Sequence, residues 1–359
     1  MKLKYKIGVI IILIALALNY GIDPLGLIKT AQEKVKENTA NLITGNILSI
    51  PSEFNKEINV YFCPKDNCQS EVLKTTSTAK SSIHCAIFDL DLPDLIEFFD
   101  KASNYIDVKI VVDNENWKHV KHLNFTKKDS TSQFSHNKFC VIDNNKIWTG
   151  SFNPTENGNY KNNNNLLIIE SETLAKNYED EFREIWNGKF GKGDLVKNPK
   201  VKINTIDIEN YFCPEDWCAN KVLDQLNKAN HSIYFMTFSF THDEIGDMIL
   251  KKSDEGIKIK GIFEKKQQSK YSEYEKINSA FEKLESDKTK QANQNKVIFD
   301  SNPAAMHHKV FIIDEKTVIT GSFNPTKNGD TNNDENILII HDEKIASKFM
   351  DEFNSLWIK

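Results

Sequence analysis

Two segments of the chain carry the same polar residues at the same spacing. The first contains His136, Lys138, Asp143, Ser151 and Asn153, and the second contains His307, Lys309, Asp314, Ser322 and Asn324. Imidazole can attack as a nucleophile or exchange protons near neutral pH. Lysine supplies a cation for phosphate oxygens, and serine and asparagine supply neutral donors. These residue types favour phosphoryl transfer, with one histidine attacking phosphorus and the other protonating the leaving oxygen.

The chain around these segments is duplicated. Matching pairs are INVYFCPKDNC (58–68) with IENYFCPEDWC (208–218), VKIVVDN (108–114) with IKIKGIF (257–263), and YEDEFREIW (178–186) with FMDEFNSLW (349–357). A period this long with two copies indicates a duplicated domain. We expect repeat 1 over residues 57–190, a linker over 191–206 and repeat 2 over 207–359.

Each half alternates short β-branched or aromatic runs with helical spacing, and ends in a hairpin-like pair and a closing helix. This order predicts an α/β fold of two tandem domains, each a mixed β-sheet flanked by helices. If the copies meet across a pseudo-twofold axis, both histidines and both lysines surround one anion. One chain then suffices for a complete site, so we expect a monomer.

The repeated signature HxKxxxxD followed by GSxN resembles that of the phospholipase D superfamily, and the resemblance covers nearly all of the chain from about residue 57. It implies a metal-independent phosphodiesterase without a cofactor, working through a phosphohistidine intermediate. By similarity, His136 is the nucleophile and His307 is the general acid and then the base. The lysines, Ser151, Asn153, Ser322 and Asn324 are expected to bind phosphate.

The two copies differ in the residue expected behind each histidine. Members of the superfamily commonly carry a carboxylate beyond GSxN that bonds the histidine of the opposite motif. Glu335 occupies this place in the second copy, whereas Asn164 occupies it in the first. A carboxylate stabilises an imidazolium, and an amide only orients the ring. If the pairing crosses over, Glu335 supports His136 as the residue that becomes charged.

Three further polar residues have structural interpretations. Asp143 and Asp314 belong to the signature, but each ends its strand beside turn residues, which favours a role in tying the loop together. His308 lies on the opposite strand face from His307 and is expected to be structural.

The six cysteines divide into two groups. Cys63 with Cys68 and Cys213 with Cys218 form Cys-x4-Cys pairs, for which local disulfides, a shared zinc site and free structural thiols are the alternatives. We favour disulfides. Cys85 and Cys140 lie in apolar strand patterns and are expected to be buried thiols.

The N-terminus has three lysines followed by an uncharged run from Ile7 to Ile22. This pattern predicts a membrane anchor or a signal sequence over residues 1–27, with a juxtamembrane spacer over 28–56. Either interpretation places the catalytic part outside the cytoplasm, anchored to the membrane or secreted after cleavage.

Residues 264–296 form an insertion in the second half. Their mixed charges favour a solvated amphipathic helix. The alternative is a lid or a substrate-groove element carrying Lys265, Lys266, Lys270, Tyr271 and Tyr274.

Composition restricts the substrate without identifying it. The 359 residues are 39% hydrophobic and 27% charged, which is typical of a globular protein, and the formal net charge of −5 excludes a global basic field. Two compact repeats without a lipid-targeting domain favour a nuclease acting on DNA or RNA. The membrane segment and the acidic charge suit the alternative, a phospholipase D or phosphatidyl transferase resembling cardiolipin synthase. A binding protein without catalytic activity, for nucleic acid or membrane, is the third hypothesis.

Overall fold

The computed structural model describes residues 50–130, 132–286 and 295–357. The compact unit Pro51–Lys359 contains both repeats. The predicted anchor and residues 287–294 of the insertion lie outside the described residues. In the part that is described, no helix has the length and apolar character needed to cross a bilayer.

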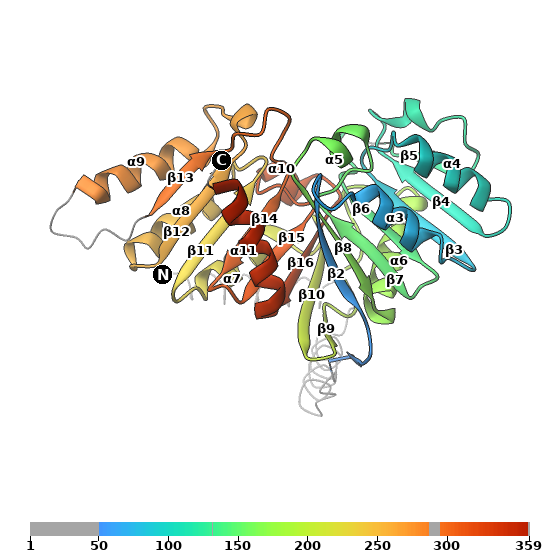
Figure 1. Cartoon of the computed structure of the whole chain (residues 1–359), viewed down its shortest axis with the longest axis horizontal. Helices are drawn as coiled ribbons and strands as arrows, with labels where there is room; N and C mark the ends of the chain where they lie inside the picture. The colour runs from blue at the N-terminus through green and yellow to red at the C-terminus, as the bar shows by residue number, and fades with distance from the viewer. Residues whose placement is uncertain (1–49, 131, 287–294, 358–359) are drawn as a thin grey trace, which may run out of the picture. The chain divides into compact units, whose positions relative to one another are not determined.

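The first repeat alternates strands and helices as predicted (Figure 1). Its elements are β2 (Ile58–Cys63), α3 (Cys68–Thr76), β3 (Ser82–Ile87), α4 (Pro93–Ala102), β4 (Asp107–Val112), η1 (Trp117–His119), β5 (Thr126–Lys128), β6 (Lys138–Ile142), β7 (Lys146–Gly150), α5 (Glu156–Tyr160), β8 (Asn164–Glu170) and α6 (Glu172–Trp186).

The second repeat follows the same order, with the additional helix α9 between η2 and β13. Its elements are β10 (Ile206–Cys213), α7 (Cys218–Asn227), β11 (Ser232–Thr237), α8 (Asp243–Asp254), β12 (Lys258–Phe263), η2 (Lys265–Gln267), α9 (Glu273–Ser286), β13 (Lys296–Phe299), β14 (Lys309–Ile313), β15 (Thr317–Gly321), α10 (Lys327–Thr331), β16 (Glu335–His341) and α11 (Glu343–Trp357).

Each repeat forms a mixed sheet. The order is β2-β8-β7-β6-β3-β4-β5 in the first, and the second contains the equivalent run β10-β16-β15-β14-β11-β12-β13. Two short strands, β1 (Ser52–Glu53) and β9 (Lys200–Ile203), extend the second sheet beyond β10. The end of the predicted spacer and part of the predicted linker are therefore built into a sheet.

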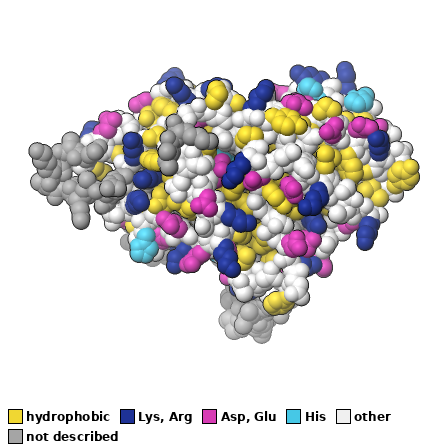
Figure 2. Space-filling model, viewed as in Figure 1, with side chains coloured by type: hydrophobic (Ala, Val, Ile, Leu, Met, Phe, Trp, Pro, Cys, Tyr) yellow, Lys and Arg dark blue, Asp and Glu magenta, His cyan; other side chains and the backbone are white. Residues whose placement is uncertain are grey.

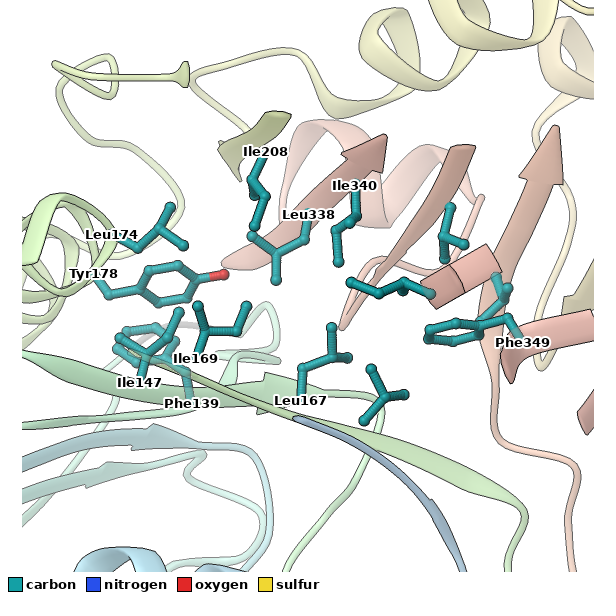
Figure 3. Close-up of a cluster of buried hydrophobic side chains, with 14 of the residues drawn as sticks. Phe139, Ile147, Leu167, Ile169, Leu174, Tyr178, Ile208, Leu338, Ile340 and Phe349 are labelled. Carbon is teal, nitrogen blue, oxygen red and sulfur yellow. The ribbon is translucent and has the colours of Figure 1, made fainter. Parts of the chain in front are cut away.

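A core shared by the two repeats holds the sheets together. Tyr178 of α6 packs against Phe212 of β10 with ring centroids 5.0 Å apart, and Phe349 of α11 packs against Phe62 of β2 at 5.1 Å. Each closing helix thus contacts the other repeat. Figure 3 shows residues of both repeats, including Leu167 and Leu338, in one buried cluster. Burial of this apolar surface disfavours separation of the halves.

The expectation of free thiols at Cys85 and Cys140 is wrong, because the structure joins them in a disulfide. The two residues are direct partners on the antiparallel strands β3 and β6, with Cα atoms 4.0 Å apart. Residues opposite each other on such strands have close Cβ atoms. The apolar pattern correctly indicated buried strands, but the register that brings the two cysteines together was not visible from it.

The described part of the insertion is a packed helix. Ile277 and Phe281 of α9 are buried, and the ring of Tyr274 stacks on Phe299 of β13 with centroids 3.8 Å apart. This is an amphipathic helix, as one interpretation held. Lys266 lies before the helix, and its Nζ donates to the backbone carbonyls of Pro303 at 2.7 Å and of Ala304.

Candidate active site

The two signature histidines lie just before equivalent central strands. β6 and β14 begin at Lys138 and Lys309, so each histidine precedes its buried strand by two residues. The backbone N–H of His136 donates to Asp334 O at 2.9 Å, and that of His307 donates to Asn163 O at 2.8 Å. Each histidine is therefore held by backbone of the opposite repeat, and the two motifs form one site.

Glu335 lies behind His136. Its Oε2 is 2.7 Å from His136 Nδ1 and also accepts from Ser322 Oγ at 2.7 Å, while its Oε1 accepts from Asn333 Nδ2 at 3.2 Å. Burial raises the pKa of Glu335 to about 8, although Lys138 and these hydrogen bonds oppose the shift. When Glu335 is ionised, it accepts the proton on Nδ1, which leaves the Nε2 lone pair available for attack.

Asn164 lies behind His307, in the matching place. Nδ1 of His307 is 2.9 Å from Asn164 Oδ1 and 3.0 Å from Ser151 O. Both acceptors are neutral, so this imidazole is oriented without a negative charge behind it. Burial, Lys309 and Lys138 hold the pKa of His307 well below its usual value. The crossed pairing expected from the sequence is the arrangement in the structure.

The two lysines are fully buried beside the histidines. Lys138 Nζ donates to His136 O at 2.7 Å, and Lys309 Nζ donates to His307 O at 2.9 Å. Burial lowers the pKa of Lys138 to about 7, and burial together with Lys138 lowers the pKa of Lys309. An anion bound between them would favour the protonated ammonium of each.

The serines and asparagines of the signature have different surroundings. Ser151 Oγ accepts from Asn165 N and Ser322 Oγ from Asn336 N, both at 2.9 Å, and both serines are fully buried. We therefore assign them to positioning instead of the expected phosphate contact. In contrast, Oδ1 of Asn153 and of Asn324 is buried without a hydrogen-bond partner in the described structure. Because only the Nδ2 group of an amide can donate to a phosphate oxygen, phosphate binding by these two residues stays a prediction.

Asp143 and Asp314, which the signature groups with the catalytic residues, lie outside the site. Each aspartate directly follows the end of a strand that begins at the signature lysine. With the usual rise per residue of a β-strand, the aspartate lies roughly 16 Å along the backbone from that lysine. Asp143 accepts from the backbone N–H groups of Lys80, Ser81 and Ser82, and these bonds lower its pKa against the effect of burial. Asp314 makes the equivalent contacts in the second repeat, so both aspartates tie a loop to the strand end.

His308 is a buried structural residue, as expected. Its Nδ1 is 3.1 Å from Asn165 Nδ2, and its Nε2 is 3.4 Å from Glu352 Oε1. Asn137 takes the matching place in repeat 1, where its Oδ1 accepts from Asn336 Nδ2 at 2.8 Å. These contacts join the repeats behind the site.

Sequence reasoning missed two aromatic residues at the site. The ring of Phe88 lies 4.9 Å from that of His136, and the ring of Phe238 lies 4.7 Å from that of His307. Nζ of Lys138 and of Lys309 lies 5.0 Å and 4.8 Å from the same two ring centroids. The available signal was a further matching pair of segments, SSIHCAIF (81–88) and HSIYFMTF (231–238), which both end in phenylalanine.

Two acidic residues were also missed. Asp113 and Glu264 directly follow the equivalent strands β4 and β12. The sequence alignment of 108–114 with 257–263 was shifted by two residues, so it did not place Asp113 opposite Glu264. In the structure the matching strands are 107–112 and 258–263. Aligning acidic residues as well as apolar ones would have found the pair.

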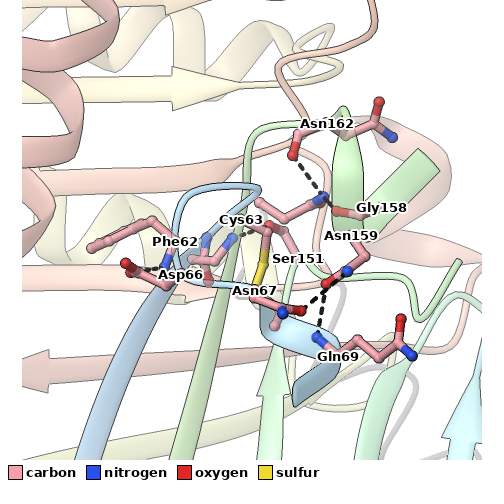
Figure 4. The surroundings of a disulfide bond; sticks show 12 residues. Phe62, Cys63, Asp66, Asn67, Gln69, Ser151, Gly158, Asn159 and Asn162 are labelled. Atoms are coloured by element: carbon pink, nitrogen blue, oxygen red, sulfur yellow. Dashed lines mark hydrogen bonds between the residues drawn. A yellow bond between two sulfur atoms is a disulfide. The ribbon is translucent and has the colours of Figure 1, made fainter. Parts of the chain in front are cut away.

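The Cys-x4-Cys pairs are local disulfides in the structure, Cys63–Cys68 and Cys213–Cys218. No cluster of residues suited to hold a metal ion occurs within the described ranges. Figure 4 shows how the first disulfide loop is connected to α5: Gln69 N donates to Asn159 Oδ1 at 2.7 Å, and Asn159 Nδ2 donates to Asn67 Oδ1 at 3.3 Å.

Comparison with known proteins agrees with this geometry. The family model described as "Cardiolipin synthase, PLD-like domain" matches residues 72–186 and 222–357. The chain therefore belongs to the phospholipase D superfamily. Within it, both repeats are PLD-like domains.

The individual relatives have different names. The chain is 30% identical over 139 residues to the mitochondrial cardiolipin hydrolase of Chlamydomonas reinhardtii, over 38% of this chain and 56% of that protein. It is 28% identical over 155 residues to phospholipase D of Rickettsia prowazekii, over 43% of this chain and 69% of that protein. The chain thus spans about half the length of the first relative.

A solved structure shares the fold across both repeats. Phosphatidylserine synthase of Haemophilus influenzae aligns over 82% of this chain and 85% of its own, with a TM-score of 0.60 and 14% identity.

Proposed function

We propose that this protein is a phosphodiesterase that works without a metal ion or cofactor, and that its substrate is DNA or RNA. The observation that carries the reaction class is the crossed arrangement of two buried histidines, one backed by Glu335 at 2.7 Å and the other by Asn164 at 2.9 Å. This arrangement provides a nucleophile and an acid–base residue in one site, with Lys138 and Lys309 to balance charge on the phosphoryl group.

The proposed reaction has two steps. Nε2 of His136 attacks phosphorus, the bond to the leaving oxygen breaks, and that oxygen takes a proton from His307. Glu335 stabilises the charge that the phosphorylated imidazole acquires. Water then attacks the phosphohistidine, gives a proton to His307, and releases the phosphate product and free His136. His307 needs a raised pKa for the first step, and the negative charge of the bound diester acts in that direction.

A cavity near the site that contains two lysines and two asparagines favours nucleic acid. A cavity of about 430 Å³ is lined by Asn157, Lys161, Asn162, Lys266, Pro303 and Ala304. It is connected to the catalytic loop, because Asn163 N donates to Ala305 O, two residues before His307. Amides and exposed ammonium groups suit a neighbouring phosphate and sugar better than acyl chains. Contact must be local, because Lys/Arg and Asp/Glu are interspersed across the face seen in Figure 2.

The second candidate is phospholipid hydrolysis or transfer, which the names of the relatives favour. The discriminating experiment incubates the full chain, in detergent and excess chelator, with single- and double-stranded DNA, RNA, phosphatidylcholine and cardiolipin. We expect nucleic-acid cleavage that is lost in His136→Ala and His307→Ala. Release of a lipid product with intact nucleic acid would overturn the nuclease proposal in favour of the lipid one. Binding of nucleic acid without cleavage would favour the binding protein.

We further propose that the catalytic part functions outside the cytoplasm, anchored or secreted. All six cysteines are paired in disulfides, which persist in oxidising compartments. Thiol titration of the protein isolated under non-reducing conditions should find no reactive thiol before reduction and six afterwards. Free thiols in the isolated protein would contradict the proposal.

A further inference from the structure

A carboxylate binds the backbone directly before each catalytic histidine. Asp113 Oδ2 accepts from Ser135 N at 3.0 Å, and Ser135 precedes His136. Glu264 Oε2 accepts from Met306 N at 2.6 Å, and Met306 precedes His307. Both carboxylates are buried, with exposed fractions of 0% and 2%. The two copies therefore make the same contact with side chains of different length.

The second carboxylate oxygen of each residue is also used in the same way. Asp113 Oδ1 accepts from Glu115 N at 3.0 Å, and Glu264 Oε1 accepts from Lys266 N at 2.8 Å. Each carboxylate thus clamps the turn after its own strand to the loop that carries the histidine. Hydrogen bonds to a charged acceptor are stronger than neutral ones, and removal of a buried acceptor leaves N–H groups unsatisfied.

The clamped residues also contact the opposite repeat. Ser135 forms a parallel bridge with Asp334, the neighbour of Glu335, and Met306 forms one with Asn163, the neighbour of Asn164. The carboxylate therefore fixes the backbone of the same loop whose imidazole is fixed by Glu335 or Asn164. Small displacements of this loop would change the approach of the imidazole to phosphorus.

The carboxylates act on the lysines as well. Burial lowers the pKa of Lys138, and the negative charges of Glu335, Asp113 and Asp89 raise it. Lys309 is influenced by Lys138, which lowers its pKa, and by Glu335 and Glu264, which raise it. Asp113 therefore belongs to the surroundings of one lysine, and Glu264 to those of the other.

We propose that Asp113 and Glu264 are a matched pair of positioning residues, each fixing the backbone that leads into one catalytic histidine and placing negative charge near the lysine of the same motif. The inference rests on the proposed phosphodiesterase function. Neither residue is part of the superfamily signature found in the sequence.

The test compares Asp113→Asn and Glu264→Gln with Asp113→Glu and with Asp66→Asn. Asp113→Glu introduces the residue that repeat 2 already uses. Asp66→Asn is the structural control, because Asp66 Oδ2 also accepts a backbone N–H, from Phe62 at 2.8 Å, in the Cys63–Cys68 loop and not in a segment that carries a catalytic histidine. The full chain is assayed with bis(p-nitrophenyl) phosphate in chelator from pH 5 to 9, and thermal unfolding is followed in parallel.

We expect the Asn and Gln variants to lose roughly 10–100-fold in kcat with KM within about 3-fold, as is typical when an outer residue that orients a catalytic group is lost. The alkaline limb of the kcat profile should move to lower pH, because each lysine loses a neighbouring negative charge. Asp113→Glu should retain most of kcat. Asp66→Asn should change only the unfolding temperature.

The proposal is overturned if Asp113→Asn and Glu264→Gln lower the unfolding temperature but match Asp66→Asn in kcat and pH profile. Equal loss in Asp113→Glu and Asp113→Asn would also overturn it. A wild-type chain that cleaves no diester refutes the proposed function instead. In that case NMR titration of the imidazole signals still tests the positioning. Asp113→Asn should shift the titration of His136 more than that of His307, Glu264→Gln should do the reverse, and unchanged titrations overturn the pair.

Discussion

The half of the site around His136 and the half around His307 have equivalent backbone contacts but differ in the ionisable groups behind the histidines. Behind His136 stand Glu335 and its neighbour Asp334, whereas Asn164 and Asn163 occupy the matching places behind His307. Burial raises the pKa of both Asp334 and Glu335 to about 8. Duplication has therefore preserved the hydrogen-bonding geometry, while replacement of carboxylate by amide has separated the two histidines chemically.

The loops closed by the Cys63–Cys68 and Cys213–Cys218 disulfides also differ in their ionisable residues. Glu215 lies in the second Cys-x4-Cys loop near Glu181, and its pKa is raised to about 7, first by burial. Lys65 has the equivalent place in the first loop. One flank of the site is thus acidic, and the flank with Lys161 and Lys266 is not. We therefore expect an anionic substrate to lie along the flank with Lys161 and Lys266.

The largest effect is expected from replacing either histidine. His136→Asn and His307→Asn should each lower kcat by roughly 10²–10⁴-fold, the usual contribution of a positioned acid–base group. The two variants should differ with a p-nitrophenyl diester, whose leaving group needs little protonation. His307→Asn should accumulate a covalent phosphoryl adduct on His136, detectable by acid-quench mass spectrometry, and His136→Asn should form none. An adduct on His307 would reverse the assigned roles.

The next effect is expected from exchanging the residues behind the histidines. Glu335→Gln should lower kcat roughly 10–100-fold, because the charged imidazole loses its carboxylate. Asn164→Asp should raise the pKa of His307, so that its protonated form persists to higher pH and the pH profile extends in the alkaline direction. Steady-state rates across pH 5–9 measure both changes. Identical profiles for Asn164→Asp and wild type would show that the amide is not what distinguishes the halves.

The sequence predicted most of the fold and the centre of the site because both depend on local spacing. The β-branched runs located β4, β6 and β8, and the duplicated signature identified the histidines, the lysines and the crossed Glu335 contact. Local spacing in the sequence could not show which residues contact each other across neighbouring strands. The Cys85–Cys140 disulfide and the contact of Asp113 with Ser135 depend on register and on chain packing over 55 and 22 positions. The burial of Ser151 likewise depends on β8, whose Asn165 N donates to Ser151 Oγ.

A smaller effect, on stability, is expected from Asp334. Its pKa is raised from 3.8 to about 8, first by burial, so the folded chain holds this proton more tightly than the unfolded chain. The resulting stability is fully present below about pH 4 and is lost as pH rises through about 8. One pKa unit corresponds to about 1.4 kcal/mol. Asp334→Asn should therefore flatten the fall in unfolding free energy between pH 6 and 9.

Chemical denaturation at those two pH values measures the slope. The counterpart Asn163→Asp should steepen it by placing a carboxylate in the other half. If Asp334→Asn and wild type lose the same free energy of unfolding, Asp334 does not hold the proton in the folded chain, and its ionised carboxylate adds to the negative charge behind His136.

The smallest effect is expected from Lys161 and Lys266, the two exposed lysines on the flank of the site that we call the polar flank. Neither Lys161 nor Lys266 forms an ion pair within the described residues, and both line the cavity of about 430 Å³. The double variant Lys161→Ala/Lys266→Ala should raise KM for an oligonucleotide a few-fold, while KM for a small diester stays unchanged. The salt dependence of oligonucleotide binding should also weaken, by a slope of about one for each phosphate that the variant no longer binds.

Lys197→Ala is the matched control for this flank, because Lys197 is exposed beside the acidic residues Glu181 and Glu184 and is already paired with Asp180 at 2.7 Å. Its loss should leave oligonucleotide KM and the salt slope unchanged. If both variants have the same effect, the substrate does not follow the polar flank, and the acidic residues near Glu215 do not direct it. A change confined to the double variant would show that the charge difference between the halves guides the substrate as well as the proton.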